Sequence, residues 1–317
     1  MLTGNPSALD QPRWAVLLLA EGAPDRLGDI PQFLLNVRAG CGLSENAVQE
    51  IIRRYAGIGG GSPLLRVTKQ QADGLATALG LPVYVGMRNW KPYIEDAVRK
   101  LVEDGASQAV AVCLAPQSSR TSIELYHRHV ATAVDKFAPG LHVEFVEQWH
   151  DHADLIAAFR EKVSAALAGA EVESGEPVPV VFTAHSIPEK AVAEGDPYES
   201  QVQETARLLA KSMGLKGYQV AFQSQGMTSE PWAGPAVESL IDEFAKKGSR
   251  RVLLAPIGFV SDHVEILYDI DVAFREYGQK RGVCVVRPES LNASPLLIRC
   301  LASIVSNRIE IAAGRSS

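Results

Sequence analysis

Short apolar runs alternate along this chain with longer segments in which apolar residues recur every three or four positions. Runs of about four to seven residues, rich in valine, leucine and alanine, are typical of buried strands. They lie at residues 14–20, 82–85, 109–114, 141–146, 178–182, 218–222, 251–254 and 283–286. Between them the helical period predicts helices at residues 47–55, 68–79, 94–103, 155–167, 201–213 and 236–247.

Strands that alternate with helices predict βαβ units, in which parallel sheets are covered by helices on both faces. Four strands in each half of a 317-residue chain predict an α/β fold with two Rossmann-like (doubly wound, parallel-sheet) domains. The tripeptide Leu114-Ala-Pro116 of the first half recurs as Leu254-Ala-Pro256 in the second. We expect domains at residues 1–150 and 151–317, with a last helical segment, 295–309, that could pack on either.

The charge balance and the apolar content narrow the class of protein. With 46% hydrophobic and 21% charged residues, the chain has the composition of a globular protein with sizeable cores. A net charge of −6 argues against a nucleic-acid partner, because phosphate binding needs a basic surface. No apolar run approaches the roughly 18–20 residues that a membrane span needs, and residues 1–12 lack the features of a signal peptide. We therefore expect a cytoplasmic protein with no transmembrane segment.

The four cysteines show no spacing typical of a disulfide framework, a zinc site or an iron–sulfur cluster. Cys41, Cys113, Cys284 and Cys300 are far apart in the sequence. Two of them lie in strand-like runs, where buried free thiols are common. A reducing compartment is the simplest interpretation.

One histidine follows a predicted strand at the position where open α/β sheets bind their ligands. His185 comes after the apolar run 178–182, and ligands of such folds lie beyond the carboxyl ends of the strands. A histidine alone in this position is more often a core or capping residue. In the first half, Glu21 and Gln117 follow the corresponding strands, and in the second the segment 258–265 does. Two domains that face each other would form one cleft lined by all four strand ends.

Three carboxylates lie after the seventh strand, at Asp262, Glu265 and Asp269. This i, i+3, i+7 spacing places them on one face if the segment is helical, and a solvated acidic stripe is the common alternative. The flanking residues are mostly apolar, and apolar surroundings suit a carboxylate to metal binding or proton transfer. His185 with Glu265 would then form an imidazole–carboxylate pair able to hold a divalent ion or pass protons.

The glycine-rich stretch 57–63 is neither a G-x-G-x-x-G fingerprint nor a P-loop, so the strongest sequence signal for a nucleotide cofactor is missing. Arg38, Arg54 and Arg88 could still pair with ligand carboxylates in two-point geometry, although a surface role is the alternative for each. Trp232 lies in a loop after the sixth strand and is either a packing anchor or an apolar wall for a flat ligand.

Together these segments resemble the ferrochelatases, which insert ferrous iron into a porphyrin. The matching motifs are TAHSIP at 183–188, GDPY at 195–198, FQSQGMTSEPWAGP at 222–235, PIGFVSDHVEILYD at 256–269, YAGIGGGSPL at 55–64 and NWKPYIED at 89–96. The likeness runs from about residue 16 to residue 304, and the second-half motifs are long and specific. It implies a chelatase-type fold with the active-site cleft between two Rossmann-like domains.

The resemblance further implies a lyase in which His185 and Glu265 bind metal or take the pyrrole protons, with Asp269 as a further metal residue. Fe²⁺ is a substrate and leaves in the product, so no cofactor is required. Cys300 is solitary, so the iron–sulfur cluster of some members is not expected. Glu21 stands where many coproporphyrin enzymes have a tyrosine that ligates iron. It could ligate iron too, deliver it from the face opposite His185, or have no metal role.

Within the family the chain looks closer to the branch that acts on coproporphyrin III and makes iron coproporphyrin III (coproheme) in heme biosynthesis. The stretches 36–40 and 89–90 favour this branch. The matching substrate-binding positions are Arg38, Arg54, Tyr55, Ser62 and Tyr126, to which we add Arg88 and Trp232. Coproporphyrin has four propionates, so additional arginine and hydroxyl contacts would discriminate in its favour.

Three alternatives stay open at this point. The first is a protoporphyrin IX ferrochelatase that makes protoheme. The second is a cobalt or nickel chelatase, whose usual paired histidines the His185/Glu265 arrangement does not supply. The third is a non-catalytic tetrapyrrole carrier, against which the presence of His185 and Glu265 argues, or a two-domain solute-binding protein, against which the lack of signal-peptide features argues. Partners would be the porphyrin, Fe²⁺ and, transiently, heme-pathway proteins that supply iron or receive product.

Overall fold

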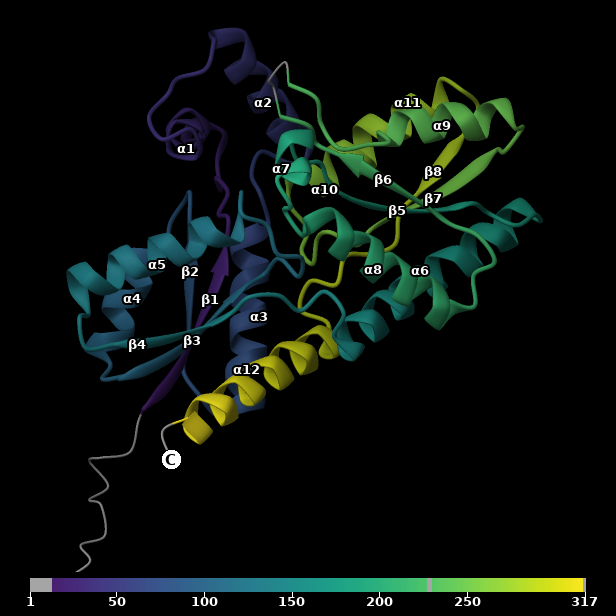
Figure 1. Ribbon diagram of the computed structural model, residues 1–317. Coiled ribbons are helices and arrows are strands. Elements are labelled where there is room, and N and C mark those ends of the chain that lie inside the picture. The colour runs from purple at the N-terminus through teal and green to yellow at the C-terminus, as the bar shows by residue number, and fades with distance from the viewer. Residues whose placement is uncertain (1–12, 227–229, 316–317) are drawn as a thin grey trace, which may run out of the picture.

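The computed structural model describes residues 13–226 and 230–315. Within these residues the chain forms two four-stranded parallel sheets, with strand orders β2-β1-β3-β4 and β6-β5-β7-β8 (Figure 1). The strands are β1 (Trp14–Ala20), β2 (Val83–Met87), β3 (Gln108–Cys113), β4 (His142–Val146), β5 (Val180–His185), β6 (Gln219–Gln223), β7 (Arg251–Pro256) and β8 (Cys284–Val286). The predicted α/β fold with parallel sheets is confirmed.

Helices cover both faces of each sheet, as the alternating pattern predicts. Those between the strands of the first sheet are η1 (Leu27–Asp29), α1 (Ile30–Val37), α2 (Glu45–Gly57), α3 (Leu64–Leu79), α4 (Ile94–Glu103) and α5 (Ile123–Phe137). Those that follow are α6 (Ala153–Ser174), α7 (Glu189–Ala193), α8 (Tyr198–Met213), α9 (Val237–Lys246), α10 (Val264–Leu267), the π-helix η2 (Asp269–Phe274), α11 (Arg275–Gln279) and α12 (Pro295–Arg315). The sequence pattern did not predict α1 or α5.

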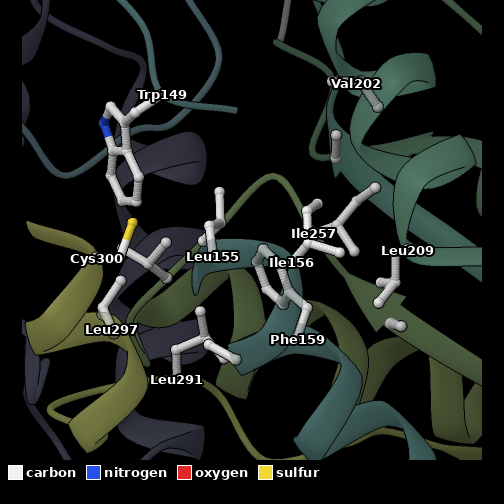
Figure 2. Packing of buried hydrophobic residues seen from close by; sticks show 14 of the residues in the cluster. Trp149, Leu155, Ile156, Phe159, Val202, Leu209, Ile257, Leu291, Leu297 and Cys300 are labelled. Atoms are coloured by element: carbon white, nitrogen blue, oxygen red, sulfur yellow. The ribbon is translucent and has the colours of Figure 1, made fainter. Parts of the chain in front are cut away.

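The last helix joins the two sheets. α12 packs against α3, β3 and β4 of the first half and against α6, which precedes the second sheet (Figure 1). One hydrophobic cluster therefore runs through both halves, from Val16 and Val110 of the first sheet to Phe182 and Leu253 of the second. Figure 2 shows its middle, where Leu297 and Cys300 of α12 lie near Trp149 and the start of α6.

Both sheets bring chemically useful side chains to the same kind of position. β1 has β2 on one side and β3 on the other, and β5 has β6 and β7. The strand order reverses at such a strand, and open α/β sheets bind ligands in the crevice beyond its carboxyl end. Glu21 directly follows β1, and His185 is the last residue of β5.

The carboxylate segment after β7 is not one continuous α-helix. α10 begins only at Val264, after His263 in extended conformation, so Asp262 does not share a helical face with Glu265. Asn292 holds Asp262 away from the helix, because its side chain accepts from the Asp262 amide and donates to the Asp262 carboxylate, both at 2.9 Å. The expected i, i+3, i+7 face is therefore wrong for Asp262.

None of the helices in the described part of the chain is both long enough and apolar enough to span a bilayer.

Candidate active site

A cavity of about 430 Å³ lies between the carboxyl ends of the two sheets. The expected convergence of four strand ends occurs here, because the cavity is lined by Glu21, Gln117, His185 and the segment 258–265. Its other walls are largely apolar and include Leu19, Leu64, Leu114, Ile187, Pro188, Phe259, Val260 and Trp232. An apolar cavity with a few converging polar groups is typical of a small-molecule binding site.

The second-half wall holds an imidazole–carboxylate pair. His185 Nε2 lies 3.6 Å from Glu265 Oε1, and the side chains are 36% and 29% exposed, so both remain accessible from the cavity. The other ring nitrogen of His185, Nδ1, lies 2.5 Å from the carbonyl oxygen of Ser186. With Nδ1 bonded to the backbone, Nε2 is the nitrogen directed at Glu265.

A second imidazole faces the same carboxylate. His263 Nε2 lies 3.6 Å from Glu265 Oε2, and His263 Nδ1 lies 2.9 Å from the carbonyl oxygen of Ser261. Its ring packs on that of Phe259 with centroids 4.9 Å apart. The wall thus contains two histidines on either side of one carboxylate, which the sequence interpretation did not anticipate.

Buried polar side chains hold this pair of strand ends together. The amide of Gln223 donates to the carbonyl oxygen of Glu265 at 2.9 Å and accepts from the Thr183 hydroxyl at 2.7 Å. The main-chain oxygen of Gln223 also accepts from the amide of Ser186. A Cβ on Gly258 would lie 2.7 Å from the Cβ of Ala184, so only glycine lets the turn after β7 approach β5 this closely.

His185, Glu265 and His263 form a His–Glu–His group in which the ionisation of each side chain depends on the other two. Burial alone would lower the pKa of His185, but the Glu265 carboxylate raises it to about 9. Burial would raise the pKa of Glu265, but the two imidazoles hold it well below its usual range. The pKa of His263 is likewise raised above its ordinary value, because Glu265 outweighs the effect of burial. At neutral pH this wall therefore holds an ionised carboxylate beside the protonated imidazole of His185.

The first-half wall presents a carboxylate of its own. Glu21 Oε1 accepts hydrogen bonds from Arg88 and from the Asn89 side chain, both at 3.3 Å. The Arg88 guanidinium also stacks on the ring of Tyr126, 5.1 Å from its centroid. Burial, together with the nearby Glu21 charge, raises the pKa of Tyr126 well above its ordinary value, so Tyr126 stays a neutral hydroxyl.

A loop rich in hydroxyl groups forms one edge of the cavity. Ser119, Thr121 and Ser122, between β3 and α5, line it. The second half holds this loop in place: Asp196 accepts from the Ser119 hydroxyl at 2.9 Å, and Gln201 accepts from the Ser118 amide at 2.7 Å. Gln117 points its amide into the protein, toward Thr205 and the Ile257 carbonyl, each at 3.2 Å.

The predicted site residues fall into two groups. His185, Glu265, Glu21, Arg88, Tyr126 and Trp232 line the cavity. Five others lie outside its walls: Arg38, Arg54, Tyr55, Ser62 and Asp269.

The residues of the second group have identifiable surroundings. Arg38 is exposed at the end of α1, whereas Tyr55 is buried in a cluster with α1 and Trp90. Ser62 is buried and accepts from the Leu64 amide at the start of α3. Asp269 accepts from the Ser224 hydroxyl at 2.5 Å, and Arg54 Nη1 lies 3.8 Å from its carboxylate. Burial raises the pKa of Asp269 to about 6.

Sequence reasoning missed His263 and Gln223. His263 had a usable signal, because it lies two residues before Glu265 in the segment that follows the seventh predicted strand. Gln223 had none, since its amide serves residues 40 and 42 positions away. In the described residues no three His, Cys, Asp or Glu side chains are close enough to form a ready-made metal site.

Comparisons with known proteins agree with the motifs. A family model described as Ferrochelatase matches residues 13–309. A ferrochelatase of Acidobacterium capsulatum is 46% identical over 314 residues, which covers 94% of this chain and 95% of that protein. A coproporphyrin III ferrochelatase of Geobacillus sp. (strain WCH70) is 36% identical over 307 residues, which covers 94% of this chain and 99% of that protein.

Among solved structures, SirB from Bacillus subtilis with Fe³⁺ has a TM-score of 0.61, and the match covers 95% of this chain and 98% of that one. At 14% identity this likeness supports the fold alone. The family model and the sequence relatives establish the family. The cavity, with its carboxylates and imidazoles, agrees with it. The chain belongs to the ferrochelatase family, lyases of heme biosynthesis that insert iron into a porphyrin.

Proposed function

We propose that this ferrochelatase acts on coproporphyrin III, with His185 and Glu265 as the groups that bind Fe²⁺ and accept the pyrrole protons. The observation that carries the substrate choice is the set of hydroxyl groups in residues 119–122, which line the cavity together with Arg88. Coproporphyrin has propionates at the two positions where protoporphyrin has vinyl groups, so hydrogen-bond donors favour it. Relatives named coproporphyrin III ferrochelatase, at 36% and 34% identity, support the same choice.

The proton chemistry follows from the charge of the wall. Insertion exchanges two pyrrole protons for one Fe²⁺, so two protons must leave. In the free enzyme His185 is protonated at neutral pH, because its pKa is raised to about 9. An Fe²⁺ ion bound beside Glu265 repels the imidazolium proton, which leaves to solvent, so metal arrival converts His185 into a neutral base. The His185–Glu265 pair can then take up the two pyrrole protons one after the other and release each to solvent, with His263 on the other side of Glu265 as a second imidazole.

Glu21 lies on the opposite wall, and we assign it contact with iron from the other face of the porphyrin. Arg88 and Asn89 both bond its Oε1 and so fix its carboxylate beside the cavity. A carboxylate is a hard anionic donor that suits iron. Glu21→Gln is expected to shift the absorption spectrum of the bound iron porphyrin product, while insertion stays within a few-fold of wild type. An unchanged spectrum would leave Glu21 without a metal role.

We assign Asp269, Arg54 and Arg38, which do not line the cavity, to the surface over which the substrates enter it. Asp269 and Arg54 lie next to each other, and a carboxylate with a raised pKa can bind or release a cation near neutral pH. We assign Asp269 to the path by which Fe²⁺ reaches Glu265. Arg38 and Arg54 are the cations for propionates that extend beyond the cavity.

The deciding experiment is anaerobic Fe²⁺ insertion with coproporphyrin III and protoporphyrin IX in parallel. We expect a higher kcat/KM for coproporphyrin III. The double variant Thr121→Val/Ser122→Ala should lower kcat/KM for coproporphyrin III by about tenfold and leave that for protoporphyrin IX within twofold. Thr132→Val, whose hydroxyl bonds only within α5, is the matched control and should change neither. Equal losses for both porphyrins, or a preference for protoporphyrin IX, would contradict the substrate assignment.

The catalytic assignment has its own test. His185→Ala and Glu265→Gln should each lower the insertion rate by about 100-fold or more while porphyrin binding persists. Because the wall contains two imidazoles, Co²⁺ should be assayed beside Fe²⁺. Full insertion by His185→Ala would remove this histidine from the mechanism, and faster insertion of Co²⁺ than of Fe²⁺ would favour a cobalt chelatase instead.

A further inference from the structure

One buried side chain of the first half reaches the catalytic wall of the second. Gln71 lies in α3 and is fully buried, among apolar neighbours such as Ala72 and Leu75. Its amide nitrogen donates to the Ser261 hydroxyl at 2.9 Å and to the Asn292 carbonyl oxygen at 2.8 Å. Ser261 follows β7, and Asn292 lies between β8 and α12. Gln71 therefore fastens α3 to two loops of the other half.

These two loops are also bonded to each other. The Asn292 amide donates to the carbonyl oxygen of Val260 at 2.8 Å, and its side chain bonds both the amide and the carboxylate of Asp262. Asn292 has φ +45°, a left-handed conformation that asparagine tolerates better than most residues. Residues 260–262 are thus held by Asn292, while Gln71 holds Ser261 and Asn292 together.

The segment that Gln71 fixes determines where His263 points. The carbonyl oxygen of Ser261 is the partner of His263 Nδ1, at 2.9 Å. With that nitrogen bonded, His263 Nε2 is directed at Glu265 Oε2, 3.6 Å away. A shift of Ser261 would therefore be transmitted through one hydrogen bond to the imidazole and on to the carboxylate.

Stability alone does not explain a glutamine at this place. The Gln71 side-chain oxygen is buried and has no hydrogen-bond partner in the described part of the chain. An unsatisfied buried acceptor is unfavourable, and the other buried side chains of α3 nearby are mostly apolar. A leucine or methionine would fill the same space without an unpaired oxygen. What only the amide supplies is the pair of bonds to Ser261 and Asn292.

We propose that Gln71 is a positioning residue for metal insertion, which sets the geometry of His263 and Glu265 through Ser261. In this role the first domain contributes to the metal-binding wall of the second without touching substrate. The inference rests on the proposed function, because it takes Glu265 as the group that carries the chemistry.

The test is the variant Gln71→Met, assayed for Zn²⁺ and Fe²⁺ insertion. We expect kcat to fall by about tenfold with the porphyrin KM within twofold, because a small displacement of a catalytic group slows the chemical step more than it weakens binding. Thr68→Val is the matched control, since it removes a fully buried hydrogen bond to Leu64 in the same helix. It should lower the melting temperature and leave kcat unchanged.

A double-mutant cycle separates positioning from a general structural effect. In a His263→Gln background, Gln71→Met should change kcat by less than twofold, because the residue through which Gln71 acts is already altered. An equal loss in both backgrounds, or a kcat for Gln71→Met that matches Thr68→Val, would overturn the inference. If Gln71→Met does not fold, Ser261→Ala removes the same hydrogen bond from the other side and should give the same tenfold loss; full activity would contradict the proposal.

Failure of this inference is distinguishable from failure of the proposed function. If Glu265→Gln abolishes insertion and Gln71→Met keeps the wild-type rate, only the role of Gln71 is wrong. If Glu265→Gln inserts metal normally, the catalytic wall itself is wrong, and the inference about Gln71 falls with it.

Discussion

At the scale of single residues, the site is governed by charges that control one another at short range. Glu265 has an imidazole 3.6 Å from each of its oxygens, so no one of the three side chains has an ionisation of its own. Asp269, four residues further along, shows the opposite shift, because burial outweighs the effects of the Ser224 hydroxyl and of Arg54, 3.8 Å away. Two carboxylates near one another in sequence therefore titrate in different pH ranges: Glu265 stays ionised well below its usual range, whereas Asp269 gains a proton at about pH 6.

Glu265→Gln should lower the pKa of His185 from about 9 to below its ordinary value of 6.5. The reason is that burial still disfavours the imidazolium, while the neighbouring negative charge is gone. NMR titration of the His185 ring in the free enzyme measures this directly. Glu147→Gln, a remote exposed acid, is the control and should leave the His185 titration unmoved. A pKa that stays near 9 in Glu265→Gln would mean that another group sets the charge.

Asp269→Asn should stabilise the protein at pH 8 but not at low pH. The folded-state pKa of Asp269 is raised from 3.8 to about 6, so its ionisation costs folding free energy that is absent below pH 3.8 and complete above about pH 6. The shift corresponds to a cost on the order of 3 kcal/mol. Denaturant unfolding of the variant and the wild type between pH 3.5 and pH 8 tests it. A stability difference that does not grow with pH would contradict the assignment.

At the scale of elements, the apolar runs of the sequence predict the strands well, because a strand buried on both faces needs a near-continuous run of apolar residues. Each of the eight predicted strands is present among the described residues, within a few residues of its expected ends. β5 extends past the apolar run to His185, because the hydroxyl of Thr183 is satisfied by Gln223 from the neighbouring strand. The break between Asp262 and α10 depends on Asn292, 30 residues later, so the local sequence does not predict it. The same holds for the site. Residues at strand ends, such as Glu21 and His185, could be predicted, whereas the role of Gln223, which bonds Thr183 and Glu265 far away in the sequence, could not.

The packing of α12 on the first sheet depends in part on a single carboxylate, so one substitution should weaken it. Glu144 of β4 has a nearly buried carboxylate, 2.9 Å from Arg308 and 3.8 Å from Arg315 of α12 and 3.0 Å from His142. Glu144→Gln should destabilise the protein by about 1–3 kcal/mol, because it leaves Arg308 partly buried without its counter-charge.

Thermal or denaturant unfolding measures this effect. Glu194→Gln is the matched control, since Glu194 is exposed and its contact with Lys190 is 3.8 Å long. Such a surface pair should contribute less than about 1 kcal/mol. If the two substitutions cost the same, the contact between Glu144 and α12 does not hold the helix.

At the scale of the whole molecule, the active site exists only because two sheets share an interface. Its cavity is lined on one side by Glu21 and the hydroxyl groups of residues 119–122 from the first half. The other side is lined by His185, Glu265 and His263 from the second half. Polar contacts across the interface, such as that between Asp196 and Ser119, fix the two walls relative to each other. Beneath them one hydrophobic cluster contains strand residues of both sheets together with α6 and α12 (Figure 2).

That shared cluster predicts that the two halves unfold together. Leu155 of α6 is fully buried within it, whereas Leu101 and Leu240 belong to clusters confined to the first and second sheet. Substitution of any of the three by alanine should cost about 2–5 kcal/mol and lower one common transition. Differential scanning calorimetry with circular dichroism tests this. If the halves were independent, Leu101→Ala and Leu240→Ala would each shift a different one of two transitions, and only Leu155→Ala would affect both.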